Sequence, residues 1–283
     1  IVGFITQPLP IGGVSIVVIT VAALTGTLKI GEAISGFANS AIWLIVGAFL
    51  FSRGFIKTGL GKRIAYNLIA AFGSSSLRLA YALALSDLIL APATPSNTAR
   101  VGGVIMPITT SLAKAFGSEP QDGPRKIGSF LMQSIYQVNT ITSAMFQTSM
   151  AGNTLVAALA LQSFGIGITW GDWAMAAIVP GIIALIIMPY FIYKVYPPEI
   201  KDAREAQQMI KEELKGLGKM SFQEWVMLGV FILALVLWAT SQFTKLDATT
   251  VAFLGISILL ATSVLVWDDV KSEKGAWDTL VWM

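Results

Sequence analysis

Long apolar runs recur along the chain and are separated by short polar segments. They occupy residues 11–26, 41–58, 173–194, 222–241 and 248–266, and a partial run opens at Trp277. A helix needs roughly 17 to 25 such residues to cross about 30 Å of hydrocarbon, and most of the runs have this length. Because backbone groups in lipid must be hydrogen-bonded within their own segment, the pattern predicts membrane-spanning helices and an all-α polytopic membrane protein.

The composition strengthens this prediction. Hydrophobic residues make up 55% of the chain and charged residues 12%, and the mean hydropathy of +0.72 is far above that of soluble domains. We therefore expect an integral, multi-pass protein embedded in a lipid bilayer. With neither cysteine nor histidine in the chain, we expect no metal and no cofactor. The small net charge of +3 lies mainly in loops, so we expect no nucleic-acid partner.

The loop charges predict how the chain crosses the bilayer. Lysine and arginine concentrate in residues 52–78, 114–126 and 194–219. The positive-inside rule places all three segments on the cytoplasmic side. A single crossing between the first two would put them on opposite sides, so residues 77–116 are predicted to enter and return as a re-entrant helical hairpin. Residues 127–164 then form one crossing, interrupted partway.

An internal repeat is the second organising feature. Residues 9–28 resemble residues 246–265, and residues 39–44 resemble residues 278–283. The charge pattern puts the corresponding loops on opposite sides, which predicts the inverted repeat of many secondary transporters. The predicted segments are scaffold spans (1–76), transport elements (77–164), a last span (165–196), a cytoplasmic linker helix (197–220) and the start of a second, incomplete repeat (221–283).

The sequence APATPSNTAR at residues 91–100 interrupts the hairpin. Its two prolines stop a helix, since proline lacks an N–H and its ring clashes with the preceding turn. Irregular backbone at membrane depth is tolerated only where it is buried or lines a cavity. Ser96, Asn97 and Thr98 then lie at the N-terminus of the returning helix, where free N–H groups and the helix dipole favour an anion. We predict an anion site; the alternative is a capped turn without a ligand.

Arg100 follows this triplet. A charge inside a span costs at least ~2.5 to 3.5 kcal/mol, so the side chain should face a cavity or a counter-ion. We expect its guanidinium to bind a substrate carboxylate in bidentate geometry; snorkelling to the surface is the alternative. Asp87 and Arg78 lie in the same hairpin and are interpreted as salt-bridging or capping residues without a ligand role.

A second interruption is predicted in residues 143–160. Gly152 and Asn153 are expected to break this helix, and Asn153 with Thr154 to cap the half that follows. The alternative is a glycine that only allows close packing. Two breaks of similar chemistry predict a shared substrate site near the bilayer midplane.

The segments APATPSNTARVGGVIMP, SAMFQTSMAGN, YPPEI, LDATTVA and GAWDTLVW together resemble the divalent anion/sodium symporter superfamily. The resemblance is closest to its branch of 2-oxoglutarate/malate translocators and citrate/succinate antiporters, and it runs over essentially the whole chain. It implies a homodimeric secondary transporter in which each repeat supplies a Ser-Asn-Thr hairpin and a broken span to a dicarboxylate site. Carried over, the first half-site comprises Ser96, Asn97, Thr98, Gly152 and Asn153.

The resemblance also bears on coupling. Sodium-coupled members bind Na⁺ at these tips, which here would be Ser96, Asn97 and Gly152. Exchanger-like sequences carry an arginine after Ser-Asn-Thr-Ala, as Arg100 does, and its fixed charge can replace the cation. We therefore expect sodium-independent exchange of small di- and tricarboxylate anions in a bacterial inner membrane or plastid inner envelope. The alternative is a sodium-coupled dicarboxylate or sulfate symporter.

Other function classes fit less well. An intramembrane enzyme needs clustered acids or a nucleophile with its base, which the sequence does not offer, so we expect no enzyme. An anion channel is disfavoured by the asymmetric broken helices. The second repeat stops before any counterpart of residues 91–100 and the chain opens without methionine, so we expect a piece of a longer protein that does not transport alone.

Overall fold

The computed structural model describes residues 2–6 and 8–283, and the regular secondary structure of these residues is helical. Within them the one extended pairing is an isolated bridge between Ser75 and Asp202. The prediction of an all-α polytopic membrane protein is confirmed.

The predicted spans appear as helices with nearly the expected bounds. They are α2 (Ile11–Leu24), α4 (Ser40–Thr58), α11 (Trp170–Val195), α13 (Phe222–Ala239) and α15 (Ala248–Ala261). Of these, α4, α11 and α13 are long and apolar enough to cross a membrane, whereas α2 and α15 are shorter. Polar residues set several starts: the side chains of Asn39, Ser221 and Asp247 accept backbone N–H groups at the beginnings of α4, α13 and α15.

Short helices join the spans. They are α1 (Val2–Thr6), α3 (Ile30–Ala33), η1 (Ser35–Ala38), α5 (Leu60–Phe72), α14 (Ser241–Thr244), α16 (Trp267–Ser272) and α17 (Lys274–Trp282). Gly59 separates α4 from α5 and has a φ of 75°, a left-handed conformation that glycine adopts without a steric penalty.

The segment predicted as a hairpin folds back on itself. Its first arm is α6 (Ser76–Leu90), its turn contains η2 (Ala91–Ala93), and its second arm runs through α7 (Asn97–Arg100), the π-helical η3 (Val101–Ile105) and α8 (Met106–Ala115). Together α6 and η2 are long and apolar enough to cross a membrane alone. Length therefore does not distinguish a hairpin from a single crossing, and the loop charges were the informative signal.

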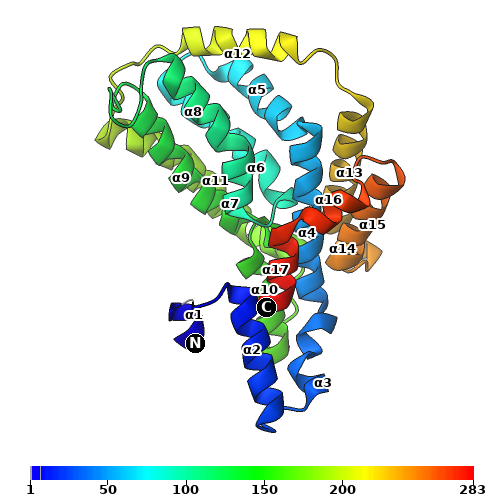
Figure 1. The fold of residues 1–283 in the computed structure, drawn as a ribbon. Helices are drawn as coiled ribbons and strands as arrows, with labels where there is room; N and C mark the ends of the chain where they lie inside the picture. The colour runs from blue at the N-terminus through cyan, green and yellow to red at the C-terminus, as the bar shows by residue number, and fades with distance from the viewer. Residues whose placement is uncertain (1, 7) are drawn as a thin grey trace.

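Both arms of the hairpin reach the end of the molecule where the linker lies (Figure 1). The amide of Ser76 donates to the carbonyl of Lys201 at 3.0 Å, and beyond α8 the carbonyl of Arg125 accepts from Glu199 at 3.1 Å. The linker forms α12 (Arg204–Gly216), which lies across this end of the molecule and buries Ala206 and Ile210 (Figure 1). The two arms thus start and finish on the same face, while their depth in a bilayer stays a prediction.

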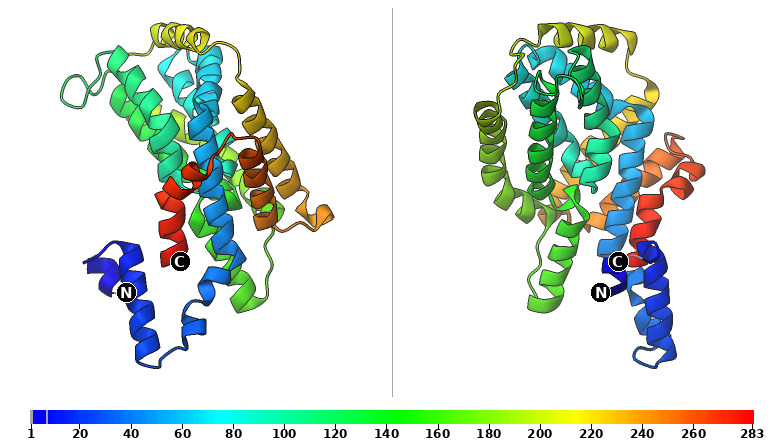
Figure 2. Two further views of the ribbon diagram at one scale, coloured as in Figure 1. Left: turned by 45° about the vertical axis from the view of Figure 1, so that its right-hand side comes forward. Right: turned by 60° about the vertical axis from the view of Figure 1, so that its left-hand side comes forward.

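The interrupted crossing consists of two helices. α9 (Gly128–Met145) runs from the α12 side, and α10 (Ala151–Phe164) continues away from it beyond a short turn, η4 (Gln147–Ser149) (Figures 1 and 2). The interruption covers residues 146–150, so the prediction that Gly152 and Asn153 break the helix is wrong by several residues. Both belong to the first turn of α10.

The packing of the last helices bears on the predicted repeat. α15 packs against α4, and α17 packs against both α2 and α4. In the predicted repeat, α2 corresponds to α15 and α4 corresponds to α17. The contact between α2 and α17 is then the counterpart of the contact between α15 and α4. This pairing agrees with the repeat, which stays a prediction.

An aromatic stack connects the broken helix to the rest of the core. Trp170, at the start of α11, lies between Phe146 and Trp238, with ring centroids 5.6 and 6.0 Å apart and planes within 18° and 19° of parallel. Phe51 of α4 adjoins Trp238. The stack therefore runs from the helix break through α11 to α13 and α4.

Candidate functional site

The hairpin turn is built as the prolines and the triplet predict. α6 ends at Leu90, and Ser96 caps the second arm, its Oγ accepting from the amide of Ala99 at 3.1 Å. The Oδ1 of Asn97 accepts from the amide of Thr98 at 2.9 Å. The amide of Asn97 itself has no acceptor among the residues that the structure describes. The start of this arm therefore presents a free N–H.

The two helix breaks are in direct contact. The carbonyl of Pro95 accepts from the amide of Ala151, the first residue of α10, at 2.9 Å. The hydroxyl of Thr148 donates to the carbonyl of Pro92 at 2.6 Å, and it also lies 2.9 Å from the indole nitrogen of Trp170. The structure thus brings together the two interruptions that the sequence places about fifty residues apart.

Asn153 and Thr154 act differently from the prediction. The Nδ2 of Asn153 donates to the carbonyls of Ser143 and Phe146 at 2.7 and 2.9 Å, and the hydroxyl of Thr154 donates to the carbonyl of Gln147 at 3.1 Å. Both residues are buried. They donate to carbonyls at the end of α9 and just beyond it, so the expectation that they cap the amides of α10 is wrong.

The accessible part of the predicted site is small and carries helix N-termini. Thr98 is exposed, and Ser96, Asn97 and Gly152 are half-buried. In the described part of the chain the amide of Gly152, like that of Asn97, has no acceptor. Both amides lie in the first turn of a helix, where unpaired N–H groups and the helix dipole favour negative charge. The arrangement is suited to binding an anion between the two breaks.

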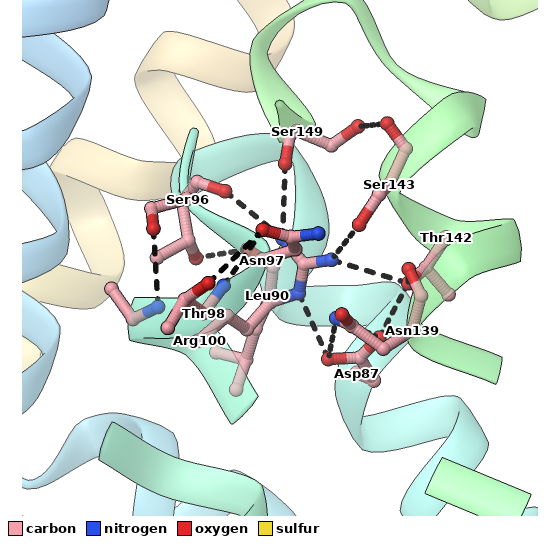
Figure 3. Close-up of polar contacts among 12 residues, drawn as sticks. Asp87, Leu90, Ser96, Asn97, Thr98, Arg100, Asn139, Thr142, Ser143 and Ser149 are labelled. Carbon is pink, nitrogen blue, oxygen red and sulfur yellow. Dashed lines mark hydrogen bonds and ion pairs between the residues drawn. The ribbon is translucent and has the colours of Figure 1, made fainter. Parts of the chain in front are cut away.

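Arg100 is not part of this accessible surface. Its side chain is fully buried, and Nε donates to Oδ1 of Asp87 at 2.8 Å. Nη1 donates to the carbonyls of Thr94 and Ser149 at 2.9 and 3.2 Å. Nη2 lies 3.2 and 3.0 Å from the hydroxyls of Thr142 and Ser143 (Figure 3).

All five N–H donors of Arg100 are therefore occupied. This corrects the expectation of bidentate binding to a substrate carboxylate, because in this arrangement no donor remains for one. The counter-ion that the sequence argument required is Asp87. Asp87 is an acidic residue in an apolar segment, thirteen positions before the arginine. This position is the signal in the sequence that could have identified it as the partner of Arg100.

An open cavity of about 720 Å³ lies between α10, the starts of α4 and α11, and the segment that joins α14 to α15. Gln147 and Thr154 line one wall, and Asn39, Lys245 and Thr249 line another. Its lining does not include Ser96, Asn97 or Thr98 among the described residues. The cavity therefore borders the second break and is separate from the Ser-Asn-Thr turn.

Comparison with known proteins agrees with this architecture. The family described as the sodium:sulfate symporter transmembrane region matches residues 1–283. The chain belongs to this family. The resemblance to the divalent anion/sodium symporter superfamily is thereby confirmed, and so is an integral, multi-pass membrane location.

Relatives named as malate or dicarboxylate transporters, and one named only as an inner membrane protein, are similar over the whole chain. The putative malate transporter YflS of Bacillus subtilis is 54% identical over 100% of this chain and 59% of its own length. The chloroplastic dicarboxylate transporter 1 of Spinacia oleracea is 47% identical over 100% of this chain and 50% of its own length. The inner membrane protein YbhI of Escherichia coli is 43% identical over 100% of this chain and 60% of its own length. The chain spans about half to three fifths of the length of these relatives.

Proposed function

We propose that the protein is a secondary transporter of small di- and tricarboxylates of the 2-oxoglutarate, malate, succinate and citrate type. The observation that carries the proposal is the meeting of two helix breaks at the Pro95–Ala151 hydrogen bond, with free amides at Asn97 and Gly152. The relatives named as malate and dicarboxylate transporters support this substrate class. Transport then involves no covalent step.

In this proposal the accessible residues bind substrate. The amides of Asn97 and Gly152 and the side chains of Ser96, Asn97 and Thr98 donate to a carboxylate. Asn153 and Thr154 support the site by holding the end of α9, as their contacts with its carbonyls indicate. Because the chain spans only part of its relatives, the remaining ligands and the homodimer expected from the resemblance belong to the whole protein.

We further propose exchange without sodium. In transporters with broken helices, unwound backbone carbonyls coordinate the coupling cation. Here the carbonyls of Thr94 and Ser149, one from each break, both accept from Nη1 of Arg100. A permanent guanidinium bound to these oxygens supports a site that needs no Na⁺. The family description favours the alternative, a sodium-coupled dicarboxylate or sulfate symporter.

Counterflow into proteoliposomes that contain the whole protein tests both parts. Vesicles loaded with unlabelled malate should take up external labelled malate equally in sodium and in choline medium. Empty vesicles should show little uptake in either medium. Strict dependence on Na⁺ would establish the symporter alternative, and sulfate uptake without any carboxylate uptake would overturn the substrate class.

A further inference from the structure

A closed polar cluster lies directly behind the hairpin turn. Its centre is the carboxylate of Asp87 on α6, which accepts from Nε of Arg100 at 2.8 Å and from the hydroxyl of Thr142. The side-chain nitrogen Nδ2 of Asn139 lies 3.3 Å from Oδ2 of the same carboxylate (Figure 3). The cluster therefore joins α6, the second arm of the hairpin and α9.

Arg100 extends the cluster to both breaks. Its Nη1 donates to a carbonyl at the hairpin turn, that of Thr94, and to a carbonyl at the end of the α9 interruption, that of Ser149. A single guanidinium thus bonds the two irregular backbone segments at once. The exposed fractions of the Arg100 and Asp87 side chains are 0% and 2%, so these bonds are shielded from water.

The chemistry of the pair argues for a geometric role. Removing two charges from water is costly, and the cost is offset only when every donor and acceptor finds a partner. The ligand-binding alternative requires the guanidinium to turn away, which would leave the buried Asp87 carboxylate without its counter-ion and remove the donor from the carbonyls of Thr94 and Ser149. Buried ion pairs add little to stability and are best attested as devices that specify one arrangement.

We propose that Asp87 and Arg100 form a clasp that holds the hairpin turn and the broken helix in one fixed geometry. This inference rests on the proposed function, because the geometry in question is the spacing between the amides of Asn97 and Gly152. Asp87 and Arg100 are positioning residues: the carboxylate orients the guanidinium, and the guanidinium fixes the two breaks. Neither contacts the substrate.

A double-mutant cycle in counterflow measures the coupling between the two residues. Asp87→Asn and Arg100→Gln should each raise the KM for malate by about tenfold or more, because each disconnects the breaks. The double variant should be no worse than the worse single one, since both act on one clasp. Ser86→Ala is the matched control: Ser86 is a buried neighbour on α6 whose hydroxyl, among the described residues, bonds only to the carbonyl of Ala82.

A substrate-binding role for Arg100 makes the opposite prediction for Asp87. Freeing the guanidinium with Asp87→Asn would then leave the KM unchanged or lower it, while Arg100→Gln alone raised it. That result, or independent and additive effects, overturns the clasp. If the pair only stabilised the fold, the variants would yield less folded protein, and the KM of the protein that folds would be unchanged. That result also overturns the clasp.

A second measurement does not depend on transport or on removing a charge. Thr142→Val deletes the hydroxyl between Asp87 and Arg100 but keeps the side-chain shape. Spin labels on cysteines at Thr98 and Met150, both exposed and one at each break, should give a narrow distance distribution in the parent. The distribution should broaden with Thr142→Val and stay narrow with Ser86→Ala.

An unchanged distribution in Thr142→Val and in Asp87→Asn refutes the clasp even if transport is lost. Conversely, broadening in the labelled protein, together with no malate counterflow by the whole protein with Thr98 and Met150 in place, upholds the clasp and refutes the proposed function. The two failures are thereby distinguishable.

Discussion

Residues of the candidate site divide into two groups with different surroundings. Ser96, Asn97 and Thr98 lie at the surface of the break, where their polar groups and the adjacent free amide can meet a ligand. Asn153 and Arg100 are buried. Asn153 donates to backbone carbonyls, and Arg100 donates to backbone carbonyls and to Asp87. The polar residues at the two helix breaks therefore serve two purposes. Some are placed to bind a ligand, and others hold the interrupted backbone together.

Matched alanine substitutions at two asparagines separate these purposes. Asn97→Ala should raise the KM for malate by about tenfold with little change in thermal stability, because the side chain is accessible and makes one local cap. Asn153→Ala should lower stability by about 1 kcal/mol, since the carbonyls of Ser143 and Phe146 each lose one of their donors. Counterflow kinetics and melting temperatures in detergent measure the two effects. A reversal of the pattern would contradict the division.

Helix elements in this protein pack through glycines as well as through aromatic contacts. A Cβ on Gly255 of α15 would lie 2.5 Å from the ring of Phe51 on α4. A Cβ on Gly181 of α11 would lie 2.6 Å from Met145, the last residue of α9. Small residues at such points let helices approach closely where the lipid supplies no hydrophobic driving force.

Gly255→Ala should therefore destabilise the α4–α15 contact by about 1 to 3 kcal/mol, because the added methyl overpacks against Phe51. Gly229→Ala on α13 is the matched control, since a Cβ there meets nothing within 4 Å. It should be neutral or stabilising by up to about 1 kcal/mol through helix propensity. Melting temperatures of the purified variants compare the two. Equal effects would show that the close approach does not matter.

At the scale of the whole molecule, both ends of the hairpin and the start of α9 lie at the end of the molecule that carries α12. This arrangement agrees with the re-entrant prediction, which came from the loop charges and which the length of α6 does not decide. The chain contains no cysteine, so single cysteines can report the side of each loop.

Cysteines replacing Ser74 and Gln121, which precede and follow the hairpin, should both react with an impermeant maleimide from the cytoplasmic side. A cysteine replacing Gly167, beyond α10, should react from the opposite side. Labelling in oriented membrane vesicles of both polarities gives the answer. Labelling of Ser74 and Gln121 positions from opposite sides would mean that the segment crosses once.

The ion pair between Lys57 of α4 and Asp269 of α16 links distant parts of the chain and makes stability depend on pH. Burial alone raises the pKa of Asp269, but hydrogen bonds from Lys57 and the Val266 amide, with the charges of Lys57 and Arg53, lower it overall. The folded pKa is thus below the unfolded one. The stabilisation is present above the unfolded pKa, near 4, and is lost as pH falls through the folded value.

Asp269→Asn should accordingly flatten part of the acid dependence of stability. Lys57 is about one third exposed, so the effect should be at most about 1 kcal/mol. Melting temperatures between pH 7 and pH 3, recorded for parent and variant, measure it. Parallel curves would show that this pair does not contribute.

The sequence alone determined the class of the molecule, the positions of its spans and the hairpin turn. Apolar runs, loop charges and the prolines of residues 91–100 act locally, so they can be interpreted without knowing what packs against them. The tertiary structure decided where α9 breaks and what Arg100 contacts. A weak helix can end anywhere within several residues, and a buried guanidinium binds whichever oxygens surround it. Those oxygens come from Asp87, Thr94, Thr142, Ser143 and Ser149, which meet only once the hairpin has folded against α9.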